Sequence, residues 1–382
     1  MKINKTQLYL NYLLFYTALS LVVSIGRMFF RLDIIQPILL FNIVIDILFV
    51  FSSIRTVDIW GKVLLVLVLV SVFIGINNNE ISRRYITDIL NPILFVLKIF
   101  SFKYIFEHAK TINAGAYFKK AARILLIVNF ILIIVIFIMI RFFPVYIGFA
   151  PSIQLPSCQY LIMGNIFFYI LAGIVVLLSG KRALLVSMIV CFLIYTILSK
   201  SKKAIYTLIV SAIIVTLSTI FLYDGFINKT KIFNKYQHSF DLLDKKNGLE
   251  EMSAGRFEEV YEITNRMSST DYIIGKGVGF YYYVIELDGK KMEAANAHIS
   301  PLGFVSKYGA IFYLFFLILY FRGIAMAIKK RKKNKVYELA LYFLINAFIE
   351  SFFAFNTFGL NYIPVLLGYA YTDPDKLSNK ID

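Results

Sequence analysis

The sequence predicts an all-α integral membrane protein, a polytopic bundle of about ten to twelve transmembrane helices with one large helical extracytoplasmic loop. Composition is the first reason, since 59% of the 382 residues are hydrophobic and only 16% are charged. Ordinary soluble domains are about 45–50% apolar and about 25% charged. The second reason is the length of apolar runs such as 124–140 and 204–222. These runs approach or reach the roughly 18 residues that a bilayer core requires.

The segments that we expect to cross the membrane occupy most of the chain. They are 8–26, 34–54, 62–76, 86–106, 123–142, 159–179, 183–199, 203–223, 302–322 and 337–355, with a shorter one at 358–371. No Ala-x-Ala-like cleavage site follows the first of them, so we expect a retained helix and not a signal peptide. We therefore expect residues 1–382 to form a single integral membrane domain.

Basic residues indicate the orientation of the helices. Six of the seven residues in 329–335 are Lys or Arg, and such clusters lie on the cytoplasmic side of a membrane. Segment 302–322 leads into this cluster, so residues 224–301 are expected to form the large extracytoplasmic loop. The same rule accounts for the net charge of +17 without nucleic acid as a partner.

The first half of the chain conflicts with this orientation. If the basic run 103–123 is also cytoplasmic, one crossing is missing or one apolar segment does not cross the membrane. The segment 141–159 is our candidate for a re-entrant stretch because it contains Pro144, Pro151 and Pro156. We take the orientation from the lysine cluster and not from the number of spans, because one misjudged span reverses every later crossing.

A helix is expected to begin in the outer loop after Ser253, because serine is a good N-cap. With about 100° of rotation per residue, one side of this helix is apolar and faces the protein. Arg256 lies on that side, within about 40° of three apolar residues, Val260, Ile263 and Met267. The charged residues expected on the opposite, water-facing side are Glu258, Glu259, Glu262 and Arg266.

Arg256 is in an unusual place for a cation, because the first turn of a helix meets the positive end of the helix dipole. An anion held between the guanidinium and the free N–H groups of the helix start removes this conflict. A lipid-linked diphosphate fits that description. The alternative is an ion pair between Arg256 and a loop carboxylate such as Asp271 or Glu286.

Three glycines alternate with other residues in 275–279. Glycine adopts positive φ and allows close backbone approach, so we expect a tight turn packed on another element. The spacing lacks the Walker pattern and no strand–helix unit surrounds it, so this is not a nucleotide-binding fingerprint. Lys276, inside the turn, is a candidate anion ligand. The aromatic run 280–283 is typical of a membrane-interface belt or of a platform for sugar rings.

His298 precedes Ser300 and Pro301, which resemble the cap and first position of a helix, so His298 is expected at the outer mouth of span 302–322. A neutral imidazole there could accept a hydroxyl proton. A structural role is the alternative for a lone histidine. The cysteines and the other histidines do not have the spacing of metal ligands, and the two cysteines, Cys158 and Cys191, suggest no disulfide framework.

Basic residues also stand at a helix junction that is expected on the outer side, in Ser179-Gly180-Lys181-Arg182. A turn with snorkelling side chains is the simpler interpretation, but positive charge on this side runs against the usual bias. Two acids lie within apolar spans, where acids are paired or functional. We expect these acids, Asp46 and Glu350, to interact with Lys98, Lys181 or Arg182.

The order of these motifs resembles one known family. Ser-Gly-Lys-Arg at 179–182 is followed by Ser-x-Gly-Arg at 253–256, a Gly-x-Gly-x-Gly turn at 275–279 and His298 before a helix. That order is similar to the O-antigen polymerase and O-antigen ligase superfamily of bacterial envelope glycosyltransferases, over roughly residues 159–330. The family usually shows His-Asn before the helix, whereas Ile299 follows the histidine here.

The resemblance implies an inverting, metal-independent and cofactor-free glycosyl transfer on the outer face of the bacterial cytoplasmic (inner) membrane. The donor would be a glycan linked to undecaprenyl diphosphate. Arg182 and Arg256 would bind the leaving diphosphate, which suits the geometry of guanidinium groups, and Lys181 and Lys276 would assist. His298 would orient or deprotonate the acceptor hydroxyl.

Polymerisation of repeat units of O-antigen or capsular polysaccharide is the activity that we favour, because the chain is short and its loop compact. An O-antigen ligase, which transfers the glycan to lipid A-core, is the first alternative. A transporter of lipid-linked oligosaccharides is the second, although we find no internal repeat of the kind common in transporters. A non-catalytic assembly scaffold is the third. Membrane lipid and a chain-length regulator are the partners that the polymerase hypothesis allows.

Overall fold

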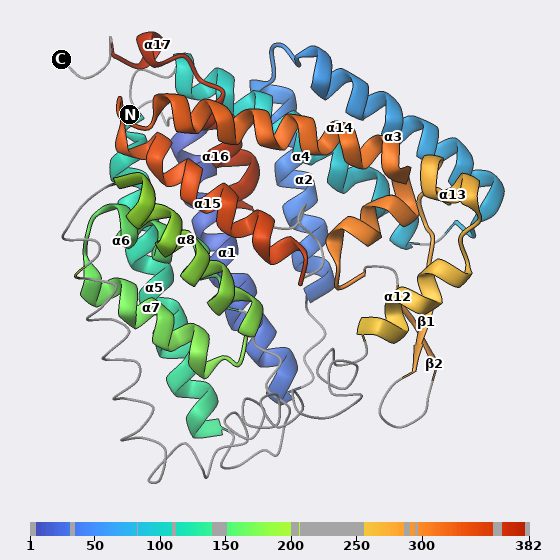
Figure 1. The fold of residues 1–382 in the computed structure, drawn as a ribbon, viewed down its shortest axis with the longest axis horizontal. Helices are drawn as coiled ribbons and strands as arrows, with labels where there is room; N and C mark the ends of the chain where they lie inside the picture. The colour runs from blue at the N-terminus through green and yellow to red at the C-terminus, as the bar shows by residue number, and fades with distance from the viewer. Residues whose placement is uncertain are drawn as a thin grey trace. The chain divides into compact units, whose positions relative to one another are not determined.

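The computed structural model describes residues 5–30, 35–81, 83–108, 112–139, 151–199, 206, 256–285, 291–294, 297–353 and 361–378. Within these ranges the chain is helical apart from turns and one antiparallel hairpin (Figure 1). The hairpin pairs β1 (Tyr282–Ile285) with β2 (Lys291–Ala294). The prediction of a helical membrane bundle is confirmed, and the small hairpin was not expected.

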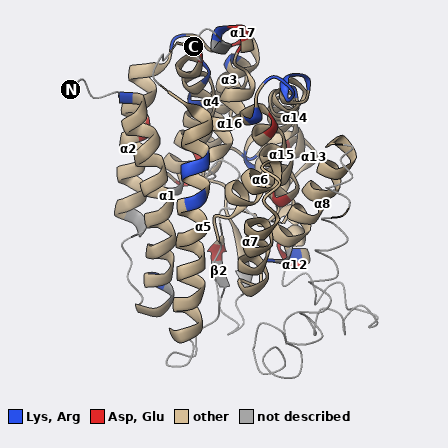
Figure 2. Ribbon diagram, turned by 90° about the vertical axis from the view of Figure 1, so that its left-hand side faces the viewer, with Lys and Arg blue, Asp and Glu red and all other residues tan. Residues whose placement is uncertain are grey.

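Five helices are long and apolar enough to cross a membrane in the part of the chain that the structure describes. These candidate spans are Lys5–Arg27, Ile59–Asn78, Tyr85–His108, Ala114–Met139 and Ser300–Lys330. Shorter apolar helices occupy Pro37–Ser53, Ile166–Leu178 and Ala183–Ser199. In Figure 2 most of the helical ribbon carries neither basic nor acidic residues. The chain is therefore a multi-pass membrane protein. The predicted span 203–223 lies outside the described residues, except for Tyr206.

The chain divides into two compact units. The first combines Met1–Asn42 with Asn113–Met252, and the second combines Ile43–Ile112 with Ser253–Asp382. The boundary at Asn42 falls within helix α2 (Ile35–Ser53). Each unit thus joins an early segment of the chain to a much later one.

The first unit packs α1 against α5, and α5 against two shorter helices, α6 and α7. The bounds of its helices are α1 (Lys5–Phe30), α5 (Ala114–Met139), α6 (Gln154–Ile162), α7 (Ile166–Leu178) and α8 (Arg182–Ser199). The core of this unit consists of branched and aromatic side chains, among them Leu126, Ile133 and Tyr160.

One predicted span in this unit is wrong. The sequence suggested a single crossing at 159–179, but the structure ends α6 at Ile162 and begins α7 at Ile166. Gly164 adopts a φ of 64°, and Asn165 caps the next helix by accepting the Phe168 N–H at 3.4 Å. The hydropathy of the segment did not reveal this break, because a glycine and an asparagine lower the average of a long apolar window very little.

The second unit is built on α14 and α16. Helix α14 packs against α3 and α15, and α16 packs against α4, α14 and α15. The bounds of these helices are α3 (Ile59–Asn78), α4 (Arg83–His108), α14 (Ser300–Lys330), α15 (Lys335–Ser351), α16 (Tyr362–Ala370) and α17 (Pro374–Ser378). Two short helices belong to the same unit, α12 (Arg256–Asn265) and α13 (Ser269–Ile274). Figure 1 shows α12 beside the hairpin and α13 beside the first part of α14.

Helix α14 is kinked at Gly309, whose φ of 85° is not helical. The kink interrupts the helical hydrogen bonds and leaves carbonyl groups of the preceding turn available. Two of them accept loop donors, because Lys276 N–H donates to Ser306 O at 2.8 Å and Gly277 N–H donates to Lys307 O at 3.0 Å. The kink thus provides an attachment point for the loop.

Two ion pairs join buried charged side chains in the second unit. Asp46 of α2 forms an ion pair with Lys98 of α4, which confirms the expected partner of that acid. A second pair, which the sequence analysis did not identify, joins Asp88 of α4 to Lys307 of α14 at 2.7 Å. Asp88 also accepts the Gly279 N–H at 3.0 Å, so it connects the glycine turn to two long helices.

Candidate functional site

Helix α12 packs its apolar side on a small core. The sequence predicted that Ile263 and Met267 face the protein, and both are buried against Phe280, Tyr282 and Ala297. The apolar stripe of α12 is therefore confirmed. The expected N-cap, Ser253, lies outside the described residues, and the described part of α12 begins at Arg256.

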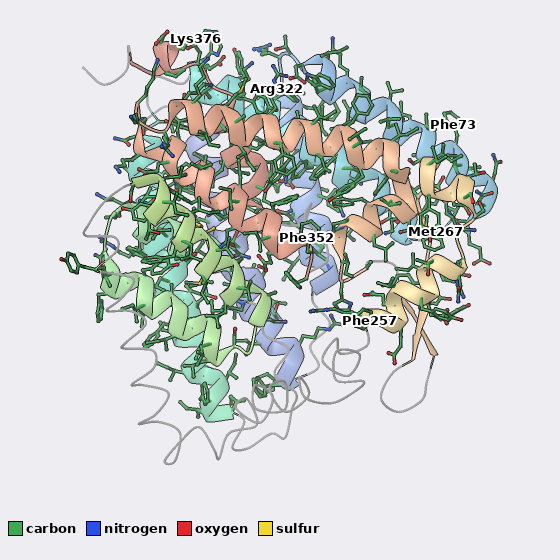
Figure 3. All side chains as sticks on the ribbon, viewed as in Figure 1. Phe73, Phe257, Met267, Arg322, Phe352 and Lys376 are labelled. Carbon is green, nitrogen blue, oxygen red and sulfur yellow. The ribbon has the colours of Figure 1, made fainter. Side chains whose placement is uncertain are left out.

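Arg256 is turned toward the protein. Its Nη2 donates a hydrogen bond to the carbonyl oxygen of Phe353 at 3.1 Å, just beyond the end of α15. The last carbonyls of a helix have no partner within the helix and carry the negative end of its dipole, so a guanidinium is favourable there. In Figure 3, Phe257 on α12 and Phe352 at the end of α15 mark the two sides of this contact.

Glu259 corrects the helical-wheel prediction. We expected it to face water, but only 3% of the residue is exposed. On the wheel Glu259 lies about 40° from Ile263, so it borders the apolar stripe and does not oppose it. Residues three apart on a helix are neighbours, so Glu259 also lies one turn from Arg256 on the same side of α12.

Glu259 holds His298. The carboxylate accepts the His298 backbone N–H at 3.1 Å, and the Nδ1 of the same residue lies 3.2 Å from Oε2. Tyr282 of β1 donates its hydroxyl to Oε1 of Glu259. The side chain of His298 is 52% exposed, whereas that of Glu259 is 3% exposed. An accessible imidazole therefore rests on a buried carboxylate, one helical turn from the guanidinium of Arg256.

The charges at this site follow from burial and hydrogen bonding. Burial has the largest single effect on the pKa of Glu259 and acts to raise it, but hydrogen bonds from His298 and Tyr282 lower the pKa below its ordinary value of 4.5. Burial, followed by the hydrogen bond to Glu259, raises the pKa of Tyr282 above its ordinary value of 10.0. At neutral pH the carboxylate is ionised and the phenol remains a donor.

Within the aromatic run 280–283, Tyr282 has neither of the two roles that the sequence suggested. That ring is 1% exposed, so it is neither a membrane belt nor a platform for sugar rings. Arg266 also departs from the water-facing prediction, since its guanidinium lies 4.7 Å from the Tyr283 ring and donates to Tyr281 O at 3.3 Å. The hairpin therefore packs over α12 and supplies the tyrosine that holds Glu259.

The glycine turn is confirmed. Gly275, Gly277 and Gly279 have φ values of 81°, 88° and 83°. A Cβ on Gly277 would lie 2.2 Å from the backbone nitrogen of Gly75 in α3, so the turn is pressed directly on that helix. Asn79, at the end of α3, donates to the carbonyl of Lys276 at 3.0 Å.

Lys276 is the predicted phosphate ligand in this turn. Its Nζ lies 3.4 Å from the Asp271 carboxylate, and its side chain is partly exposed. Asp271 also closes a capping box with Ser268 at the start of α13. The predicted role of Lys276 in binding diphosphate remains a prediction.

Lys181 and Arg182 belong to the first unit, whereas Arg256, Lys276 and His298 belong to the second. Gly180, with a φ of 68°, turns the chain between α7 and α8, and Arg182 is the first residue of α8. The predicted helix junction is therefore confirmed, and the contribution of these two cations to diphosphate binding remains a prediction.

Metal ligands and thiols give no further candidate among the described residues. No group of three or more His, Cys, Asp or Glu side chains gathers there in a way that could hold a metal ion. Cys158 and Cys191 are free and buried.

Comparisons with known proteins leave the site to be interpreted from its own geometry. No protein-family model matches the chain, and no curated protein matches it.

The sequence analysis missed Glu259 and Tyr282. An acid three residues after Arg256 and beside Ile263 on the wheel was the available signal for Glu259.

Proposed function

We propose that the chain is an inverting, metal-independent glycosyltransferase that polymerises glycan repeat units linked to undecaprenyl diphosphate, on the outer face of the cytoplasmic membrane. One observation carries the proposal. Helix α12 holds Arg256 one turn from Glu259, the carboxylate that binds His298. The guanidinium, which is suited to a diphosphate, thus lies on the same side of this short helix as the carboxylate that binds the imidazole, which is suited to a hydroxyl proton.

The proposed reaction is a single displacement. The acceptor sugar hydroxyl gives its proton to His298, and its oxygen forms a bond to the anomeric carbon of the donor. The bond from that carbon to the diphosphate oxygen breaks, and the lipid diphosphate leaves with the electron pair. Arg256 balances the charge that develops on the leaving group, with Lys276 as a proposed additional cation.

Extension of lipid-linked repeat units by the purified full chain in lipid nanodiscs tests this function. We expect the wild-type protein to lengthen the glycan and His298→Ala to lose activity by about 10²-fold or more, the contribution usual for a general base. His108→Ala is the matched control, because that histidine lies at the end of α4 and stacks on Tyr104.

Two outcomes would contradict the polymerase assignment, and a third would contradict the role of His298. Transfer onto lipid A-core without lengthening would show a ligase. Movement of the lipid-linked glycan across liposomes without bond formation would show a transporter. Full activity of His298→Ala would remove the imidazole from the reaction.

A further inference from the structure

We infer that Glu259, itself fixed by Tyr282, is a positioning residue that holds His298 with its proton on Nδ1 and presents Nε2 to the acceptor hydroxyl. This inference rests on the function proposed above and specifies which atom of the imidazole acts. It also assigns a purpose to a buried acid and a buried tyrosine that the sequence placed in water or at a membrane interface.

The first argument is the hydrogen-bond inventory of the carboxylate. An ionised carboxylate has acceptors and no donor, so the Nδ1 that lies 3.2 Å from Oε2 must carry a proton. In the neutral imidazole the second nitrogen, Nε2, then carries the lone pair. The Nδ1 edge rests on a buried group, and half of the side chain is exposed.

The second argument is that the ring is restrained at two points. The same carboxylate accepts the backbone N–H of His298 at 3.1 Å. Side chain and main chain are thus tied to one buried acid, which fixes the position of the residue and limits rotation of the ring. His298 lies two residues before α14 begins at Ser300, so the backbone on its other side is fixed as well.

The third argument concerns Tyr282, which restrains Glu259 in turn. Its hydroxyl donates to Oε1, and its ring is buried with Ile263 and Phe280. A rigid aromatic donor on β1 prevents the carboxylate from rotating toward solvent. The hairpin therefore acts through Tyr282 on Glu259, and through Glu259 on His298.

The charge of Glu259 adds an electrostatic contribution. When His298 accepts the acceptor proton, the imidazole becomes a cation beside an anion that is already in place and needs no reorganisation. A glutamine of the same shape would keep the volume but lose this charge. Its side-chain amide would also offer a single acceptor oxygen. The Tyr282 hydroxyl, the His298 backbone N–H and the His298 Nδ1 now share the two oxygens of the carboxylate.

Two measurements on the full chain in nanodiscs test the inference, and one of them does not require activity. The first is the tautomer of His298 from ¹⁵N NMR with labelled histidine, assigned by comparison with His298→Asn. We expect the Nδ1–H form in the wild type and a shift toward the Nε2–H form in Glu259→Gln. The second is the steady-state rate of glycan extension.

We expect Glu259→Gln to lower kcat by about 10²-fold with little change in KM, because general base catalysis contributes at least that much. Glu259→Asp keeps the charge and should recover part of the loss. Tyr282→Phe, which removes only the hydroxyl, should lower kcat by a smaller factor. The matched control is Glu262→Gln, which changes an acid on the same helix and should leave both measurements unchanged.

The results separate this inference from the proposed function. Glu259→Gln with full kcat and an unchanged tautomer would overturn the positioning role while the glycosyl transfer stands. A wild-type protein that shows the Nδ1–H form, loses it in Glu259→Gln and yet transfers no glycan would overturn the proposed function and leave the geometry of His298 as inferred.

Discussion

Arg256 is the first described residue of α12 and lies near the end of the helix where the dipole, like the guanidinium, is positive. The bond from its Nη2 to the carbonyl of Phe353 offsets part of this repulsion and fixes the direction of the side chain. The side chain is therefore anchored on the protein-facing side of α12.

We expect Arg256→Ala to lower glycan extension by about 10²-fold or more, since removal of one group that stabilises developing charge has an effect of this size. Arg256→Lys should also be impaired, because an ammonium cannot form the paired bonds of a guanidinium. Extension assays on membranes with equal protein content measure both effects. Arg27→Lys, exposed at the end of α1, is the control, and normal activity of Arg256→Ala would contradict the site.

Glu259 predicts a dependence of stability on pH. Its pKa in the folded protein lies below 4.5, so its contribution to stability is present above about pH 4.5 and is lost as the pH falls through the lower, folded pKa. Thermal unfolding of wild type and Glu259→Gln should therefore differ most near neutral pH and converge in acid. A difference that grew on acidification would contradict the lowered pKa.

At the scale of elements, the glycine turn joins three helices. Backbone N–H groups of 276–278 donate to carbonyls of Ser306, Lys307 and Ser71, and the Gly279 N–H donates to Asp88. The side chains of this turn contribute little to these bonds, so the close approach of the backbone is what the glycines permit. The turn thereby connects α13, and through it α12, to α3, α4 and α14.

We expect Gly277→Ala to destabilise the protein by more than about 2 kcal/mol, since strain at positive φ adds to overpacking against Gly75. Gly164→Ala is the matched control. Gly164 also has a positive φ, of 64°, but a Cβ there would meet nothing within 4 Å. Its cost should be limited to backbone strain of about 1 kcal/mol. Thermal unfolding in detergent compares the two, and equal losses would contradict direct packing of the turn.

At the scale of the whole molecule, the orientation in the membrane remains a prediction from charge. The basic cluster 329–335 follows the long span Ser300–Lys330, so its exposed lysines are expected in the cytoplasm and α12 on the other side. The Asp46–Lys98 and Asp88–Lys307 pairs keep the charges inside the second unit neutralised, as expected where solvation by water is lost.

Cysteine labelling with a membrane-impermeant maleimide measures this orientation. Tyr261→Cys, on the exposed side of α12, should be labelled in cells whose cytoplasmic membrane is intact. Lys332→Cys should be labelled only after that membrane is permeabilised. The two native cysteines are buried and should give a low background. Labelling of both variants in intact cells, or the reverse pattern, would contradict the predicted orientation.

The features that the sequence determined are those set by neighbouring residues. The membrane class follows from composition and run length, the apolar stripe of α12 from its helical period, and the turn at 275–279 from the conformational freedom of glycine. The tertiary structure alone brought together Glu259 with His298, 39 residues later, and Asp88 with Lys307, 219 residues later. Such pairs depend on how distant helices pack, and no local pattern in the chain encodes that packing.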